Sequence, residues 1–262
     1  MKRIGYILIL ILFTFIISSC NKSKIEYKLN EDKESYYVSY VDKSLTSVFI
    51  QEEYNDKPVT KIGKNAFKES KIESIIIPSS IIEICDNAFD CATNLSNLFL
   101  SNNLKRIGDF AFNSCTKLKN IEIPNSLEEI GSYAFMYCYS IDKLELKNSI
   151  TKIGSGAFMY MENLDKITLS KSIQIISENL FLGCKKIESI EIFNEVEKIE
   201  NGAFKDCINL KSIYLPNTIK SIGRDSFLNV TASIYFRGTK EEYDSILNES
   251  KEEMSKLNIV TQ

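Results

Sequence analysis

The sequence predicts an α/β solenoid, a right-handed coil of about eight 23-residue units whose strands form a parallel β ladder. Phenylalanine recurs at a fixed spacing, except that the first interval is shorter than the others by a single position. An isoleucine precedes each of these phenylalanines at a constant distance, and a short run of aliphatic residues follows each one. Self-similarity at a fixed period is typical of repeat architectures. The eight positions are Phe67, Phe89, Phe112, Phe135, Phe158, Phe181, Phe204 and Phe227.

Each unit follows the pattern I-G-x-x-A-F-x-x-C-x-x-L-x-x-I-x-L-P-x-S-L-x-x, and residues 107–129 match it best. The end of the L-x-x-I-x-L segment alternates, which places Ile121 and Ile123 on one face of a strand and Glu122 on the other. Pro124 ends that strand because proline cannot donate to a ladder. The Ala-Phe stretch is predicted to be a short helical turn or irregular backbone with the ring inside. A single unit cannot bury its apolar face alone, so the units must stack.

Both ends of the array carry signals of their own. Residues 21–58 are predicted to form a tether and an N-terminal β cap, with a hairpin whose loop is 30–35. The solenoid itself spans 59–236. Residues 237–262 are predicted to form a helical cap, because Thr239 and Glu242 have capping-box spacing. The helix that follows has its apolar residues on one side, namely Tyr243, Ile246, Leu247, Met254 and Leu257.

The segment 1–20 is predicted to be a lipoprotein signal peptide. Lys2 and Arg3 precede an apolar run over 6–17 that is shorter than the roughly 20 residues needed to cross a bilayer. The run ends in Ile-Ser-Ser-Cys over 17–20, which resembles a bacterial lipobox, although Leu and Gly or Ala are commoner at 17 and 19. The resemblance implies lipidation of Cys20, and several acyl chains would anchor the protein stably. The alternatives are a plain signal peptide with an unrelated cysteine, or an uncleaved anchor helix.

The composition disfavours most enzymes. The chain has no histidine, which removes the commonest general base and the commonest zinc ligand. It has no G-x-S-x-G, phosphate-loop or H-E-x-x-H motif, and its paired carboxylates are interpreted as solvated faces. A net charge of -3 gives no electrostatic footprint for nucleic acid. We therefore expect no catalytic site, no cofactor, no metal and no nucleic-acid partner.

Six cysteines follow Cys20, and four of them occupy the same position of the repeat, shortly after its phenylalanine. Other units have Ser70, Ala92 or Met161 at this position, which indicates a buried packing slot. The first alternative is a disulfide between stacked neighbours, and the second, a metal site, lacks paired C-x-x-C spacing. The four cysteines are Cys115, Cys138, Cys184 and Cys207.

Each predicted strand offers one outward residue between its last two inward ones. Together these residues form a stripe with apolar or aromatic ends and an acidic middle, and solenoids commonly bind partners along such faces. Exposed aromatic residues would suit an interface. The alternative is an ordinary strand surface, chosen for cross-strand fit. The candidate partner-binding residues are Ile76, Phe99, Glu122, Glu145, Thr168, Glu191 and Tyr214.

The repeat pattern closely resembles that of the BspA-like (Treponema-type) leucine-rich-repeat family over 59–236, and 54–63 and 234–243 resemble its flanking segments. The resemblance implies a cell-surface or secreted protein, and several such proteins are associated with adhesion to host matrix. We therefore expect a monomeric, adhesin-like module, lipid-anchored to a bacterial membrane at the outer membrane or cell surface, that binds an extracellular or host protein. The alternative is a structural or antigenic coat lipoprotein without a specific ligand.

Overall fold

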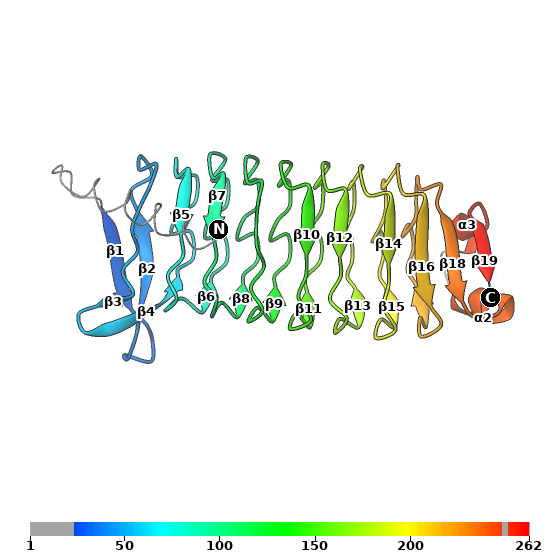
Figure 1. The fold of residues 1–262 in the computed structure, drawn as a ribbon, viewed down its shortest axis with the longest axis horizontal. Helices are drawn as coiled ribbons and strands as arrows, with labels where there is room; N and C mark the ends of the chain where they lie inside the picture. Colours follow the sequence, from blue (N-terminus) through cyan, green and yellow to red (C-terminus); the bar gives the residue numbers. More distant parts are fainter. Residues whose placement is uncertain (1–23, 248–250, 262) are drawn as a thin grey trace, which may run out of the picture.

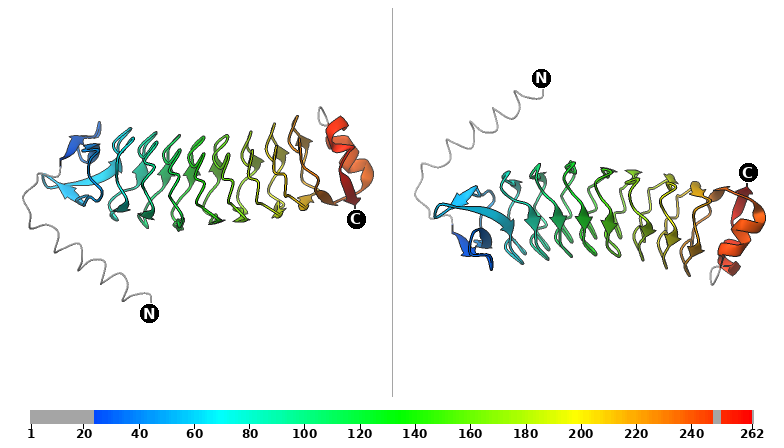
Figure 2. Two further views of the ribbon diagram at one scale, coloured as in Figure 1. Left: turned by 90° about the horizontal axis from the view of Figure 1, so that it is seen from above. Right: turned by 90° about the horizontal axis from the view of Figure 1, so that it is seen from below.

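The computed structural model describes residues 24–247 and 251–261 and shows an elongated stack of coils (Figure 1). The predicted signal peptide and Cys20 lie outside the described residues. Views from above and below show the coils following one another along a nearly straight axis (Figure 2). Among the described residues, no helix has the length and apolar character needed to cross a bilayer.

The predicted parallel ladder is confirmed. Its strands come from the alternating segment of successive units, and paired residues lie in register, as in Ile75 with Leu98 and Leu144 with Ile167. The ladder is interrupted twice among the described residues. One break lies between residues 166–168 and 189–191, and the other at residues 120–123, which pair only through an isolated bridge from Asn97 to Asn120. Its strands are β5 (Ser74–Ile76), β7 (Asn97–Phe99), β10 (Lys143–Glu145), β12 (Lys166–Thr168), β14 (Ser189–Glu191), β16 (Ser212–Pro216), β18 (Ser233–Arg237) and β19 (Asn258–Thr261).

A second parallel ladder, not predicted from the sequence, runs along the solenoid with one break between residues 152–153 and 175–176. Its strands, most of them very short, end at the repeat isoleucine that precedes the glycine position, so each buries that isoleucine. The strands are β4 (Lys57–Ile62), β6 (Glu83–Ile84), β8 (Arg106–Ile107), β9 (Glu129–Ile130), β11 (Lys152–Ile153), β13 (Ile175–Ile176), β15 (Lys198–Ile199) and β17 (Ser221–Ile222).

The outward residues of this second ladder alternate in charge over five coils. Lys61, Glu83, Arg106, Glu129 and Lys152 occupy successive positions in register. Ion pairs join each to the next: Lys61–Glu83 at 2.8 Å, Arg106–Glu83 at 3.0 Å, Arg106–Glu129 at 3.7 Å and Lys152–Glu129 at 2.8 Å. Opposite charges facing each other across paired strands stabilise a sheet, whereas like charges destabilise it. We call these five residues the charge ladder.

The Ala-Phe stretch of each unit forms turns rather than α-helix, and these turns also bond from coil to coil. The amide of Phe67 donates to the carbonyl of Ala88 at 2.7 Å, and the amide of Phe112 donates to that of Ala134 at 2.8 Å. In every complete unit the second residue before the phenylalanine and the second after it have positive φ. Such a backbone costs a residue with a Cβ roughly 1–2 kcal/mol, and glycine, asparagine and aspartate adopt it most easily.

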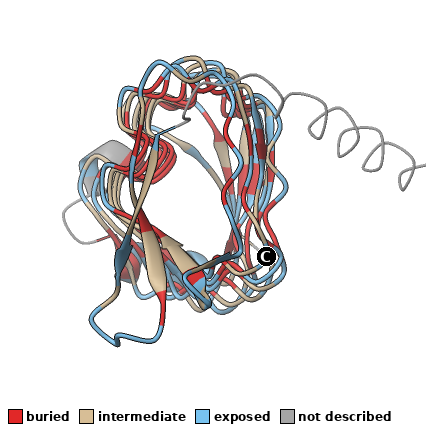
Figure 3. Ribbon diagram, turned by 90° about the vertical axis from the view of Figure 1, so that its left-hand side faces the viewer, coloured by how far each residue is buried: buried red, intermediate tan, exposed pale blue. Residues whose placement is uncertain are grey.

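The eight phenylalanines form the predicted continuous spine. Each is at most 1% exposed, and every ring stacks on the next with centroid separations from 4.6 Å (Phe67–Phe89) to 6.2 Å (Phe135–Phe158). Seen along the axis, buried residues recur at equivalent places in successive coils (Figure 3). The hydrophobic core is therefore one column that runs the length of the solenoid.

At the N-terminal end, the predicted hairpin is confirmed. Strand β1 (Ile25–Leu29) pairs antiparallel with β2 (Tyr36–Val41), and β2 then pairs parallel with β4. A short strand, β3 (Glu53–Tyr54), folds back antiparallel on β4.

At the C-terminal end, the capping box is confirmed but the single long helix is wrong. The Thr239 side chain accepts from the Glu242 amide, and the Glu242 carboxylate accepts from the Thr239 amide. The helix that they open, α2 (Lys240–Ile246), is followed by α3 (Lys251–Met254) and by β19, which pairs parallel with β18. The apolar residues of this segment are buried as predicted, except that Leu257 is half-buried. The helices thus connect two parallel strands, because such strands need a crossover.

One buried group in this end segment leads to a stability prediction. Tyr243 is 1% exposed, and its hydroxyl has no hydrogen-bond partner among the described residues. A buried polar group without a partner costs stability. We expect Tyr243→Phe to raise the free energy of unfolding by about 1 kcal/mol and the melting temperature by about 2–4 °C. Thermal unfolding followed by circular dichroism would check this, and a lower melting temperature would show that the hydroxyl is bonded.

Candidate functional site

All seven residues of the predicted stripe are exposed, and they lie along one face of the first ladder, which runs from β5 to β19. The register pairs Ile76 with Phe99, Glu145 with Thr168, and Glu191 with Tyr214. Glu122 is also exposed but belongs to the coil where the ladder is interrupted. The structure therefore aligns on one face residues that are distant in the sequence. We call this row the outward stripe.

The structure extends the outward stripe by three residues that were not predicted from the sequence. The bridge between Ser47 and Ser74 places Phe49 next to Ile76, and Phe49 is 64% exposed. At the other end, Tyr214 pairs in register with Tyr235, and Tyr235 with Val260. The apolar residues Val48 and Ile50 on either side of Phe49 were the sequence signal that could have placed Phe49 on the outer face of a strand. Each end of the stripe therefore presents three apolar or aromatic residues in a row.

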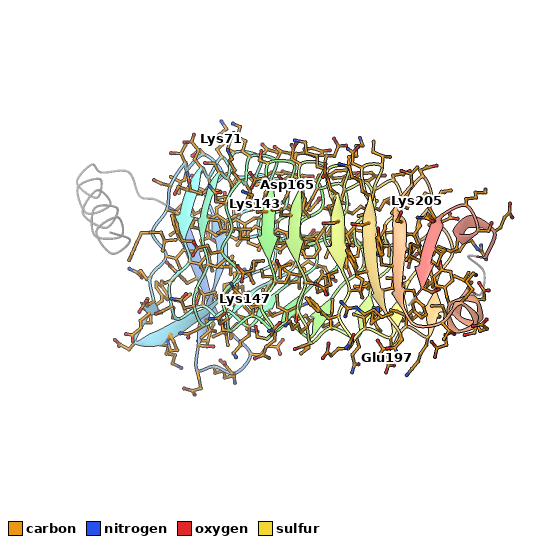
Figure 4. The ribbon with its side chains drawn as sticks, turned by 45° about the vertical axis from the view of Figure 1, so that its right-hand side comes forward. Lys71, Lys143, Lys147, Asp165, Glu197 and Lys205 are labelled. Carbon is orange, nitrogen blue, oxygen red and sulfur yellow. The ribbon has the colours of Figure 1, made fainter. Side chains whose placement is uncertain are left out.

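Two of the three carboxylates of the stripe form ion pairs within the chain. Arg237 reaches back across β16 to Glu191, with 2.7 Å between Nη2 and Oε1. Glu145 pairs with Lys147 at 2.6 Å, and Lys147 lies beyond the carboxyl end of β10 (Figure 4). The rings of Tyr214 and Tyr235 stack at 4.9 Å and stiffen the C-terminal end. Two of the three carboxylates of the stripe, Glu145 and Glu191, are therefore neutralised by ion pairs, whereas Glu122 forms no ion pair among the described residues.

An open hollow of about 490 Å³ adjoins the middle of the stripe, at the carboxyl ends of β10 and β12. Glu145 and Thr168 belong to both the hollow and the stripe. Its other polar side chains could donate hydrogen bonds to a bound group. They are Asn125, Lys147, Asn148 and Lys171, whereas the Ser149 hydroxyl is buried.

The cysteines of the repeat occupy the core and are not joined in disulfides. All six cysteines of the described residues are free, and the four repeat cysteines are buried. Each of these four thiols donates to the carbonyl of a phenylalanine in the preceding coil, as Cys138 does to Phe112 at 3.2 Å. Burial raises the pKa of Cys138 and of Cys207 to about 12. In the described part of the chain, no three His, Cys, Asp or Glu side chains are grouped as a metal site.

The burial of these thiols predicts a labelling pattern. A thiolate is the reactive form of cysteine, and a raised pKa together with burial suppresses it. With iodoacetamide at mildly alkaline pH, we expect Cys115, Cys138, Cys184 and Cys207 to stay unmodified in the folded chain and to react after denaturation. Peptide mass mapping would check this. Recovery of a peptide linking Cys115 to Cys138, or of one linking Cys184 to Cys207, would contradict it.

A stack of 23-residue coils with a parallel ladder and a phenylalanine spine defines a leucine-rich-repeat solenoid. The model of the BspA type leucine rich repeat region matches residues 33–158 and 128–250, with six copies. These matches cover well over half of the chain, so the protein belongs to the family of BspA-type leucine-rich-repeat proteins. Proteins of this type are interaction scaffolds and are not generally enzymes.

Solved structures of bacterial leucine-rich-repeat proteins have the same fold. The chain is similar to a leucine-rich-repeat protein from Bacteroides ovatus, with a TM-score of 0.74 and 25% identity over 93% of this chain and 67% of that one. It is also similar to the leucine-rich-repeat protein of Treponema pallidum, with a TM-score of 0.66 and 27% identity over 74% of this chain and 91% of that one. Comparison with curated proteins gave no match.

Proposed function

We propose that the protein is an adhesin-like module, anchored by lipid on Cys20 to a bacterial membrane, that binds an extracellular or host protein along the outward stripe. The observation that carries this proposal is the row of exposed apolar and aromatic residues at both ends of the stripe. Phe49, Ile76 and Phe99 form one end, and Tyr214, Tyr235 and Val260 form the other. Aromatic residues are enriched in protein interfaces and often contribute most of the binding energy.

Binding of the mature chain to a panel of purified extracellular-matrix proteins would test the stripe. We expect saturable binding, and we expect the double variant Phe99→Ser/Tyr214→Ser to weaken it at least about tenfold, which corresponds to ~1.4 kcal/mol. The matched control is Ile175→Ser, because Ile175 is 44% exposed but lies on the second ladder. Equal losses in both variants would contradict a role for the stripe.

The second candidate function is a coat lipoprotein without a specific ligand. The ion pairs Glu145–Lys147 and Glu191–Arg237 favour it, since among the described residues they leave Glu122 as the one carboxylate of the stripe without an ion pair. Under this alternative, no probe would bind saturably, and the Phe99→Ser/Tyr214→Ser variant would leave every surface phenotype unchanged.

The lipid anchor and the surface location of the protein are tested separately from its binding. We expect Cys20→Ala to release the protein from the membrane fraction, because the acyl chains would no longer attach. Protease treatment of intact cells should digest the protein if it faces outward. Protection from protease would place it on the periplasmic side and would contradict the surface location.

A further inference from the structure

One interface between neighbouring coils differs from all the others in the described part of the repeat array. It lies between residues 152–174, the coil that contains β11 and β12, and residues 175–197, the coil that contains β13 and β14 (Figure 1). Neither ladder crosses it, since β11 does not pair with β13 and β12 does not pair with β14. The other described coils keep at least the second ladder with each neighbour. We call this interface the seam.

A row of backbone hydrogen bonds beside the second ladder is interrupted at the same place. Before the seam the Thr151 amide donates to the Glu128 carbonyl at 3.0 Å, and beyond it the Glu197 amide donates to the Gln174 carbonyl at 2.8 Å. The equivalent bond across the seam, from the Gln174 amide to the Thr151 carbonyl, is absent among the described residues. Each coil of a repeat protein is stabilised through its neighbours, so an interface that lacks these bonds is a weak point of the array.

The side chain of Ser177 explains part of this break. Ser177 occupies the glycine position of the repeat, and its hydroxyl donates to the Ile153 carbonyl of the preceding coil. In the preceding coil a backbone amide, that of Gly154, makes the equivalent bond at 2.8 Å. Cys85 and Glu200 also carry a side chain at this position, but their amides keep the bond at 2.9 Å. Serine hydroxyls compete with backbone groups for hydrogen bonds, so the hydroxyl rather than the size of the side chain distinguishes the seam.

The turns and the core still join the two coils. The amides of Gly156 and Tyr160 donate across the seam at 2.8 and 2.7 Å. Between them the Phe158 amide donates to the Leu180 carbonyl at 3.2 Å, whereas the same bond is 2.7–2.8 Å long in the other described coils. Leu180 is buried at a position where most units have alanine, so this turn holds a larger side chain. The rings of Phe158 and Phe181 stack across the seam at 5.8 Å, which keeps the spine continuous.

Electrostatic support is weak at the seam. The charge ladder ends at Lys152, and the equivalent residue of the next coil is Ile175, which carries no charge and is 44% exposed. Among the described residues one ion pair crosses the seam, between Glu162 and Lys185 at 2.8 Å, and both of its side chains are exposed. Exposed ion pairs contribute little to stability.

We propose that the seam is a hinge, about which the part of the solenoid before residue 175 and the part from residue 175 onward bend relative to each other. The turns form the axis of this hinge, because they stay bonded where both ladders are open. The stacked core limits the motion to bending, because complete separation would expose apolar surface to water. Hinges of this kind let two rigid parts move while a few residues absorb the change.

Bending at the seam would change the angle between the two apolar ends of the outward stripe. Ile76 and Phe99 lie before the seam, and Tyr214 and Tyr235 lie beyond it. A hinge between them would allow the stripe to follow partner surfaces of different curvature. This consequence rests on the proposed function, whereas the hinge itself does not.

Distances between pairs of spin labels, measured by pulsed electron paramagnetic resonance on the full mature chain without any partner, would test the hinge. One pair, Glu128 and Lys220, spans the seam, and the matched pair, Ile82 and Gln174, spans the same number of coils without it. All four side chains are exposed, and a ladder spacing of ~4.8 Å places each pair about 19 Å apart. Labels carried on an introduced ketone amino acid leave the cysteines unmodified. We expect a distance distribution at least about twofold wider for the pair that spans the seam.

A seam-closing variant tests the cause. Ser177→Gly/Leu180→Ala restores the residues that most units have, so we expect the ladders to pair and the distribution across the seam to narrow to the width of the matched pair. Ser177→Gly alone, which leaves the core side chain in place, should narrow it in part. The control is Ser226→Ala, which makes the same change to alanine in a coil whose ladders are intact, and it should leave the distribution across the seam unchanged.

Two outcomes would overturn this inference. Equal widths of the two pairs in the parent protein would show that the seam is as rigid as the other interfaces. A wide distribution across the seam that neither Ser177→Gly nor the double variant narrows would show that the motion does not arise from the missing ladder bonds. Because no partner is present in the measurement, its outcome is independent of whether the outward stripe binds a protein.

Discussion

Replacing Phe135 with alanine is expected to lower the free energy of unfolding by about 3–5 kcal/mol. Phe135 is 1% exposed and stacks between Phe112 at 5.3 Å and Phe158 at 6.2 Å. Removing the ring leaves a cavity in the middle of the spine, and coils on either side depend on their neighbours for stability. Urea denaturation followed by far-ultraviolet circular dichroism would measure the loss.

The control for this substitution is Phe49→Ala. Phe49 is 64% exposed, so we expect its removal to cost less than about 1 kcal/mol. A loss for Phe135→Ala as small as the control's would contradict the idea that the stacked rings form the core.

Gly131→Val is expected to destabilise the protein by about 3 kcal/mol, near the upper end of the range of about 1–3 kcal/mol that is typical of overpacking. A Cβ at Gly131 would lie 2.5 Å from the carbonyl carbon of Gly108 and 2.6 Å from the amide nitrogen of Asp109, in the preceding coil. Both neighbours are backbone atoms, which cannot rotate away, so the two coils must separate. The branched side chain of valine adds to this clash. Urea denaturation of the variant and its parent would measure the difference.

Glu200→Ala is the matched control, because Glu200 occupies the same register in a later coil. That coil already accommodates a side chain, and the carboxylate pairs with Lys198 at 2.9 Å on the surface. We expect a cost below about 1 kcal/mol. If Gly131→Val lowered the free energy of unfolding as little as Glu200→Ala, the two coils could move apart at this position at little cost. Close approach of their backbones would then not explain the glycine.

The first ladder and the spine could be predicted because each repeats a strong local pattern. The aliphatic positions of L-x-x-I-x-L define an inward face, and a phenylalanine at the same place in every unit can only be buried by stacking. The second ladder gave no such signal, because most of its strands contribute a single inward residue, as in Ile130 or Ile153. Strands this short contain no periodicity, so only the stacking of complete coils creates them.

The same reason explains which parts of the candidate surface were predictable. The outward stripe follows from alternation within each strand, but Val260 lies in a segment that helical spacing dominates, and its strand forms only by pairing with β18. The positive φ of aromatic residues such as Tyr137 could not be predicted, because no residue pattern marks that backbone conformation when the residue is aromatic. Comparing equivalent positions across coils, where asparagine and glycine prevail, becomes informative only once the backbone is known.

The alternation of the charge ladder limits how the array can grow or shrink. Insertion or loss of one coil between Lys61 and Lys152 would bring two residues of the same sign face to face, whereas insertion or loss of two coils would preserve the alternation. Facing like charges destabilise paired strands. Duplications in this part of the gene are therefore expected to be tolerated in even numbers, which makes a pair of units, rather than a single one, the effective step of length change.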